Sequence, residues 1–154
     1  ENILVAQAFG RRSTGGVFLT SRRDREATHA VLADFDLEGM ANDQVASVPV
    51  LVRKKLMVAT ALVGEPHVLL LDEPVGGLTP AEIDEFLELM MKLKQRKLTI
   101  IFIEHVMRFL TALADRAVIM HQGRLIYDGS PAKLDQDETV ARIYLGSSGL
   151  AEVT

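Results

Sequence analysis

Cysteine is absent from this sequence, which excludes disulfides and thiolate metal sites and fits a reducing compartment. An excess of positive charge is also lacking. The formal net charge is −4 at pH 7, so we expect no electrostatic capture of nucleic acid. No apolar run is long enough to span a membrane, and the first residues lack a signal-peptide pattern. We therefore expect any link to a membrane to go through a partner protein.

A phosphate-binding loop is missing as well. Gly10 and Gly15 have the G-x-x-x-x-G spacing of such a loop, but Gly16 and Val17 stand where Lys and Ser or Thr would reach the phosphates and the metal. No convincing strand precedes Gly10, so we interpret residues 10–15 as a surface loop. Nothing else in the chain offers this motif.

What the chain does contain is enough apolar material for one domain with a core, since 48% of its 154 residues are hydrophobic. It begins at Glu1 and not at methionine, which suggests a fragment. The apolar spacing predicts helices over residues 1–9, 24–37 and 51–63. In the last of these helices, the basic residues 53–55 oppose the helix dipole.

The most informative stretch runs from Val68 to Pro74. Four consecutive apolar residues without period-2 alternation predict a strand buried on both faces of a parallel sheet. The run ends in two adjacent carboxylates, Asp72 and Glu73, and Pro74 stops the strand because it has no N–H. The carboxyl ends of buried parallel strands are where open α/β sheets bind ligands. The alternative is that the two carboxylates only begin a solvated loop.

A second apolar run, residues 98–103, predicts the next strand and ends in Glu104 and His105. Between the strands, Thr79 as a cap and Pro80 at the first position start a helix to about residue 96. This β–α–β unit would bring Asp72, Glu73 and His105 to one edge of the sheet, so we favour a functional His105 over a structural one. The other histidines are not expected beside carboxylates at the end of a strand, so we expect them at the surface: His29, His67 and His121.

The last third of the chain predicts a short helix over residues 106–114, a β-hairpin of 117–121 with 124–128, a helical turn after Ser130, and a helix over 138–145.

Several of these motifs together resemble the C-terminal part of an ATP-binding cassette (ABC) ATPase, the motor subunit of ABC transporters. Val68 to Pro74 is similar to the Walker-B strand of that family, and residues 75–80, Val-Gly-Gly-Leu-Thr-Pro, to its D-loop. Residues 99–105, Thr-Ile-Ile-Phe-Ile-Glu-His, resemble its switch-histidine strand, and 115–131 the hairpin that follows. The Gly-Leu-Thr-Pro D-loop and residues 143–146, Ile-Tyr-Leu-Gly, look most like the branched-chain amino acid importer subgroup.

The resemblance implies an α/β, P-loop NTPase-like fold, with a parallel-sheet core, flanking helices and a C-terminal β-hairpin. It also implies ATP and Mg²⁺ as cofactors. Asp72 would hold Mg²⁺ through a water, Glu73 would deprotonate the attacking water, and His105 would contact the γ-phosphate. Gly77 and Thr79 would belong to the nucleotide-facing D-loop. Residues 1–64 would be part of a helical subdomain, 65–146 part of the ATPase core and 147–154 a tail.

One motif departs from the family pattern. The signature of the type Leu-Ser-Gly-Gly-Gln should precede the helix over residues 53–63, yet Pro49 and Leu51 stand at its Ser and Gly positions. In the family, this stretch contacts the γ-phosphate bound to the opposite subunit. Proline supplies neither a hydroxyl nor an N–H, and leucine hinders the close approach that glycine permits.

The implied partners are a second ATPase subunit, with a different subunit favoured over an identical one, and transmembrane permease subunits. The protein would lie in the cytoplasm on the inner face of the cell membrane. The chain alone is expected to be inactive, because it has no phosphate loop. A non-catalytic, regulatory or structural cassette that docks on a membrane partner remains the alternative, and another type of P-loop protein is disfavoured.

Overall fold

The computed structural model describes residues 2–10, 22–140 and 142. The chain divides into two compact units, Glu1–Glu104 and His105–Thr154. Of the helices formed by the described residues, none combines the length and the apolar character needed to cross a bilayer. The near-match to a phosphate loop and the predicted tail lie largely or wholly outside the described residues.

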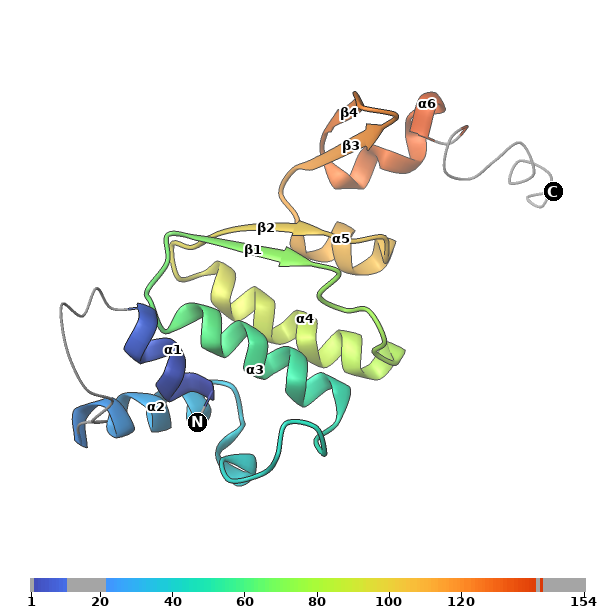
Figure 1. The fold of residues 1–154 in the computed structure, drawn as a ribbon. Coiled ribbons are helices and arrows are strands. Elements are labelled where there is room, and N and C mark those ends of the chain that lie inside the picture. Colours follow the sequence, from blue (N-terminus) through green and yellow to red (C-terminus); the bar gives the residue numbers. More distant parts are fainter. Residues whose placement is uncertain (1, 11–21, 141, 143–154) are drawn as a thin grey trace. The chain divides into compact units, whose positions relative to one another are not determined.

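The described residues of the first unit form four α-helices and a two-stranded sheet (Figure 1). The helices are α1 (Asn2–Gly10), α2 (Arg22–Asp34), α3 (Val50–Leu62) and α4 (Pro80–Lys94), with a short 3₁₀ helix, η1 (Glu38–Met40), between α2 and α3. All four α-helices lie within three residues of their predicted bounds. The sequence did not predict the short helix η1.

Strand β1 (Val68–Asp72) pairs in parallel with β2 (Thr99–Ile103), and α4 connects them. In the register, Val68 lies opposite Thr99 and Asp72 lies opposite Ile103, so both strands end at the same edge. The predicted β–α–β unit is therefore confirmed.

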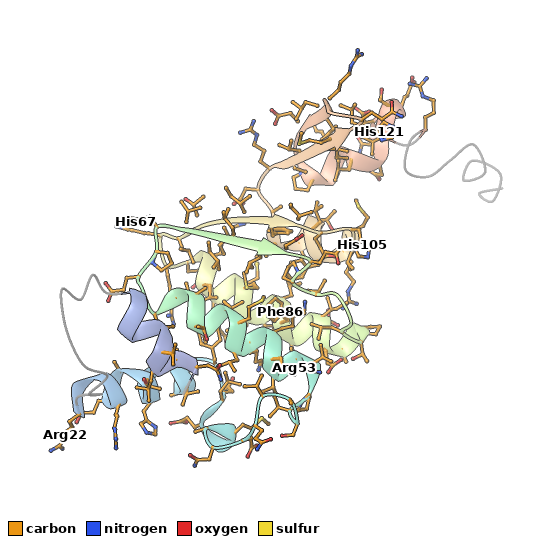
Figure 2. All side chains as sticks on the ribbon, in the orientation of Figure 1. Arg22, Arg53, His67, Phe86, His105 and His121 are labelled. Atoms are coloured by element: carbon orange, nitrogen blue, oxygen red, sulfur yellow. The ribbon has the colours of Figure 1, made fainter. Side chains whose placement is uncertain are left out.

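The core of the first unit lies on one face of this sheet, where Figure 1 shows α3 and α4 side by side. The apolar side chains of α4 recur every three or four residues, which places them on one stripe of the helix. Phe86, labelled in Figure 2, is fully buried. The main buried residues of this layer are Val58, Ala59, Leu69, Leu71, Ile83, Phe86, Met90 and Leu93.

The opposite face of the sheet is exposed, so the prediction of a strand buried on both faces is wrong. Burial alternates along β1, with Leu70 69% exposed and Val68 48% exposed. On β2, Ile101 is 53% exposed and Ile103 69% exposed. The reason is that the described helices of the first unit lie on one face, and successive strand residues point to opposite faces. We call Val68, Leu70, Ile101 and Ile103 the open sheet face.

One ion pair joins α3 to α4. Lys55 Nζ lies 2.7 Å from Glu85 Oε1, and Lys55 is only 7% exposed. A buried ammonium requires such a partner, because burying an unpaired charge is costly. The pair thus fixes α3 against α4 close to the predicted signature.

The second unit contains the predicted β-hairpin. Strand β3 (Ala117–His121) pairs antiparallel with β4 (Arg124–Gly129), and Gln122 and Gly123 both have positive φ, 47° and 74°. A two-residue turn of this kind matches the twist of the strands. The other described elements of this unit are helix α5 (Met107–Leu113), the 3₁₀ helix η2 (Pro131–Gln136) and α6 (Glu138–Val140).

The core of this second unit is small. Ala117, Leu134 and Val140 are buried together, and Ile119 and Tyr127 are partly buried against them. The helix predicted over residues 138–145 begins at Glu138 as expected, and its continuation after Val140 lies outside the described residues except for Arg142.

Candidate functional site

Glu73, the second carboxylate of the predicted pair, has an unusual backbone conformation. Its φ is +44°, in the left-handed region that favours glycine, and Pro74 follows it. A non-glycine residue held there costs on the order of 1–3 kcal/mol and persists only where the surrounding structure imposes it. Asp36, Glu65, Lys97 and Gln122 have similar φ values, between 47° and 56°, so the functional interpretation of Glu73 stays a prediction.

Three hydrogen bonds hold Glu73 in this conformation. Its backbone N–H donates to the carbonyl of Ile103 at 2.9 Å, which extends the pairing of β1 with β2 by one bond. Its carbonyl accepts from the N–H of Gly76 at 3.1 Å and from Lys54 Nζ at 2.9 Å. The backbone of Glu73 is therefore fixed from β2, from its own turn and from α3.

The turn after Glu73 is fixed in the same way. Glu104, which follows β2, accepts a hydrogen bond from the N–H of Val75 through Oε2 at 3.2 Å. A Cβ on Gly76 would lie 3.3 Å from the carbonyl oxygen of Glu73, tighter than most real contacts, so this turn requires a glycine or a small displacement. Gly77 has a φ of +80°, which also favours glycine.

Thr79 begins α4 as the predicted cap. Its Oγ1 accepts from the N–H of Glu82 at 3.4 Å, and its own N–H donates to Glu82 Oε2 at 2.8 Å. These reciprocal bonds are a capping box. The backbone N–H of Thr79, and then its hydroxyl, lower the pKa of the Glu82 carboxyl below its ordinary value. Thr79 thus has a structural role here, and its predicted contact with nucleotide stays a prediction.

Asp72 and Glu73 are both exposed at the carboxyl end of β1. Within residues 2–10, 22–140 and 142, no three His, Asp or Glu side chains are grouped as a metal site built from protein alone would need. Mg²⁺ commonly takes one or two carboxylates together with water and substrate phosphates, so a single carboxylate such as Asp72 fits a shared site of that kind.

His105 is exposed and begins the second unit, directly after Glu104. Its position relative to Glu73 stays a prediction. His29, His67 and His121 are exposed, as expected for surface histidines (Figure 2 labels the last two).

The two residues at the predicted signature lie at the start of α3. Pro49 is exposed, occupies the cap position and gives no side-chain cap to the helix. Leu51 is 7% exposed, so its side chain belongs to the core. Their predicted effect on nucleotide binding stays a prediction.

The structure also contains a hollow. It is lined by α1, α2, the segment of residues 41–48 and α3, including Ile3, Leu32 and Val48. None of the predicted site residues lines it.

Comparison with known proteins gives the family. The chain is 31% identical over 157 residues to BraF of Pseudomonas aeruginosa, a high-affinity branched-chain amino acid transport ATP-binding protein. It is 32% identical over 158 residues to LivG of Escherichia coli, which has the same description. Each match covers 96% of this chain and 62% of the relative. The chain is homologous to ABC transporter ATP-binding proteins. Since it covers 62% of BraF and of LivG, it spans less than two thirds of their length.

The ABC relatives also include a protein described with a different transport function. LptB of Escherichia coli, a lipopolysaccharide export system ATP-binding protein, is 30% identical over 83% of this chain and 53% of its own length. No protein-family model matches the chain.

Solved structures agree on the fold. An ATP-binding cassette of an ABC transporter in its ADP conformation has a TM-score of 0.81 with 18% identity, covering 94% of this chain and 61% of its own. A nucleotide-free cassette has a TM-score of 0.78 with 20% identity, covering 92% and 62%. These similarities confirm the predicted ABC ATPase fold.

Two residues that contact the turn were not predicted as site residues, Lys54 and Glu104. Glu104 could have been found, because it follows β2 at the edge where Asp72 and Glu73 follow β1. Lys54 carries no comparable signal, since it stands in a run of three basic residues that resembles a solvated helix face.

Proposed function

We propose that the complete protein, meaning the product of the reading frame that contains residues 1–154, is the ATP-hydrolysing subunit of an ABC transporter. The observation that carries the proposal is Glu73, an exposed carboxylate in a strained backbone conformation at the carboxyl end of a parallel strand. Homology to ABC ATP-binding proteins supports the same reading.

In the proposed reaction, each of the three predicted residues has one task. Asp72 holds Mg²⁺ through a water, and the ion when bound neutralises charge on the phosphates. Glu73 orients the attacking water and accepts its proton. His105 donates an N–H to the γ-phosphate, where negative charge develops. Because phosphoryl transfer depends mainly on position and electrostatics, misplacing Glu73 removes most of the rate.

The experiment is Glu73→Gln in the complete protein. The amide is nearly isosteric but cannot act as the base, so nucleotide binding is retained while ATP turnover falls about 100-fold or more. Glu88→Gln on α4 is the matched control, since Glu88 is exposed and lies on a helix outside the site. His105→Ala also slows turnover. Unchanged turnover in both site variants would rule out this edge as the catalytic centre.

We further propose that the transporter is an importer of branched-chain amino acids. BraF and LivG are described as branched-chain amino acid transport ATP-binding proteins, and they match a larger share of this chain than LptB does. The protein would lie on the cytoplasmic face of the cell membrane, bound to permease subunits. The test is uptake of labelled leucine by vesicles that contain the complete protein and its permease, with Glu73→Gln as the inactive control. Uptake of leucine no faster than that of an unrelated solute would refute the assignment.

The preferred partner is a second, different ATPase subunit with an intact signature. Pro49 and Leu51 would serve the nucleotide of an opposite subunit poorly, while Glu73 remains usable at its own site. We expect slow ATP turnover by a homodimer, faster turnover with the partner, and a gain in the homodimer from Pro49→Ser with Leu51→Gly. A fast homodimer that gains nothing from these changes would contradict this reading.

A non-catalytic cassette is the second candidate, and the altered signature favours it. Pro49 supplies neither the hydroxyl nor the N–H that the signature would offer to a phosphate. Glu73→Gln separates the two candidates, because it changes transport only if the subunit hydrolyses ATP.

A further inference from the structure

Lys54 has no part in the reaction proposed above, yet its ammonium group contacts the residue on which that reaction depends. Lys54 lies on α3, and its Nζ donates to the backbone carbonyl of Glu73 at 2.9 Å across 19 residues of sequence. We propose that Lys54 is a positioning residue, which holds Glu73 in its left-handed conformation and thereby aims the Glu73 carboxylate. This inference rests on the proposed role of Glu73 as the base.

The charge of Lys54 suits this task. A hydrogen bond from an ammonium group to a carbonyl is stronger than one between neutral groups. The carbonyl of Glu73 already accepts the N–H of Gly76, a bond that belongs to the turn alone. Lys54 adds a second bond to the same carbonyl from α3. The orientation of this carbonyl is therefore held both by the turn and by a separate helix.

Helix α3 is itself held in place. Val58 and Ala59, on the following turn, are fully buried, and Lys55 is paired with Glu85 on α4. Adjacent residues on a helix point about 100° apart, so Lys55 faces α4 while Lys54 reaches the turn after β1. Lys54 therefore extends from a fixed support, as a positioning residue must.

The first test measures hydrogen exchange by mass spectrometry in the complete protein without nucleotide. Within residues 73–78, the amides of Glu73, Val75, Gly76 and Leu78 are all hydrogen bonded. In Lys54→Met we expect exchange of this segment to rise about tenfold, with α4 unchanged, because the opening is local. Lys54→Arg restores slow exchange. Lys133→Met, at an exposed lysine of the second unit, is the control and changes nothing.

The second test measures turnover. Lys54→Met should lower kcat about tenfold or more at an unchanged KM for ATP, since nucleotide binding does not use this contact. In a Glu73→Gln background it should cost nothing further, because both changes act through the same carboxylate. If Lys54→Met opens α4 as well, Lys54→Gln provides the same comparison with a polar replacement.

The outcomes separate the two proposals. If exchange of residues 73–78 and turnover both stay normal in Lys54→Met while Glu73→Gln abolishes turnover, Lys54 is not a positioning residue and the proposed function stands. If turnover survives Glu73→Gln, the proposed role of Glu73 as the base fails, and the exchange measurement still shows whether Lys54 holds the turn. Equal losses from Lys54→Met and Lys54→Arg in both measurements would also overturn the inference.

Discussion

At the scale of single residues, Thr79 and Glu82 show how a short sequence signal fixes the start of an element. Each satisfies an N–H that the first turn of α4 would otherwise leave unpaired. We expect Thr79→Ala to lower the free energy of unfolding by about 1 kcal/mol and Thr79→Ser to preserve it. Urea denaturation at pH 7 measures the difference. Equal losses from both substitutions would mean that the hydroxyl is not the stabilising group.

The same pair gives a pH dependence whose sign follows from the lowered pKa of Glu82. A carboxyl with a lower pKa in the folded chain than in the unfolded chain stabilises the fold above the unfolded pKa, and this contribution is lost as the pH falls through the folded one. The stability difference between the natural chain and Glu82→Gln should therefore shrink in acid. Denaturation curves at pH 7 and below the ordinary carboxyl pKa test this. A difference that grows in acid would refute it.

Residue patterns marked Asp72 and Glu73 as candidates but did not predict the contacts around Glu73. The two carboxylates stand out in the sequence because they follow directly on an apolar run. Lys54 was not, because its partner is a backbone carbonyl, which every residue has and no sequence displays. For the same reason, the left-handed conformation of Glu73 was unpredictable, since glutamate does not mark that region as glycine does.

At the scale of elements, helices and strands followed from periodicity and caps, while burial did not. The run Val68–Leu71 is apolar throughout and was interpreted as buried on both faces, yet only Leu69 and Leu71 are buried. An apolar composition shows that a strand can be buried on both faces. It does not show which faces the other elements of the fold cover.

The hairpin of the second unit carries the clearest electrostatic pair. Arg116 Nε and a terminal guanidinium nitrogen donate to the two carboxylate oxygens of Asp128 at 2.7 and 2.6 Å. The Arg116 side chain lowers the pKa of the Asp128 carboxyl, chiefly through these hydrogen bonds. We expect carbonyl-detected NMR titration to give Asp128 a pKa below the ordinary aspartate value, and Arg116→Gln to return it to that value. An unchanged midpoint in Arg116→Gln would contradict the contact.

At the scale of the whole molecule, the 154 residues contain a carboxylate edge but no phosphate-loop motif. We expect them to bind Mg-ATP negligibly by themselves, because the contacts that cradle the phosphates would have to come from elsewhere. Calorimetric titration is the measurement, and micromolar binding by this chain would contradict the expectation.

The open sheet face predicts association of the isolated chain. Val68, Leu70, Ile101 and Ile103 form a contiguous apolar surface on two strands, a kind of surface that promotes aggregation. Replacing Leu70 and Ile101 with Thr keeps β propensity while removing apolar area. We expect the double variant to elute closer to the monomer position in sizing chromatography than the natural chain, with Val118→Thr on β3 as the control. Identical elution of all three would mean that this face does not drive association.

The backbone of Glu73 has a consequence for the evolution of the whole fold. Glycine would adopt a φ of +44° without penalty, so Glu73→Gly should relieve strain even as it deletes the proposed base. Selection for thermostability alone would thus drift away from the carboxylate at this position. A thermal melt of Glu73→Gly above that of the natural chain would show that the backbone conformation of this residue costs stability.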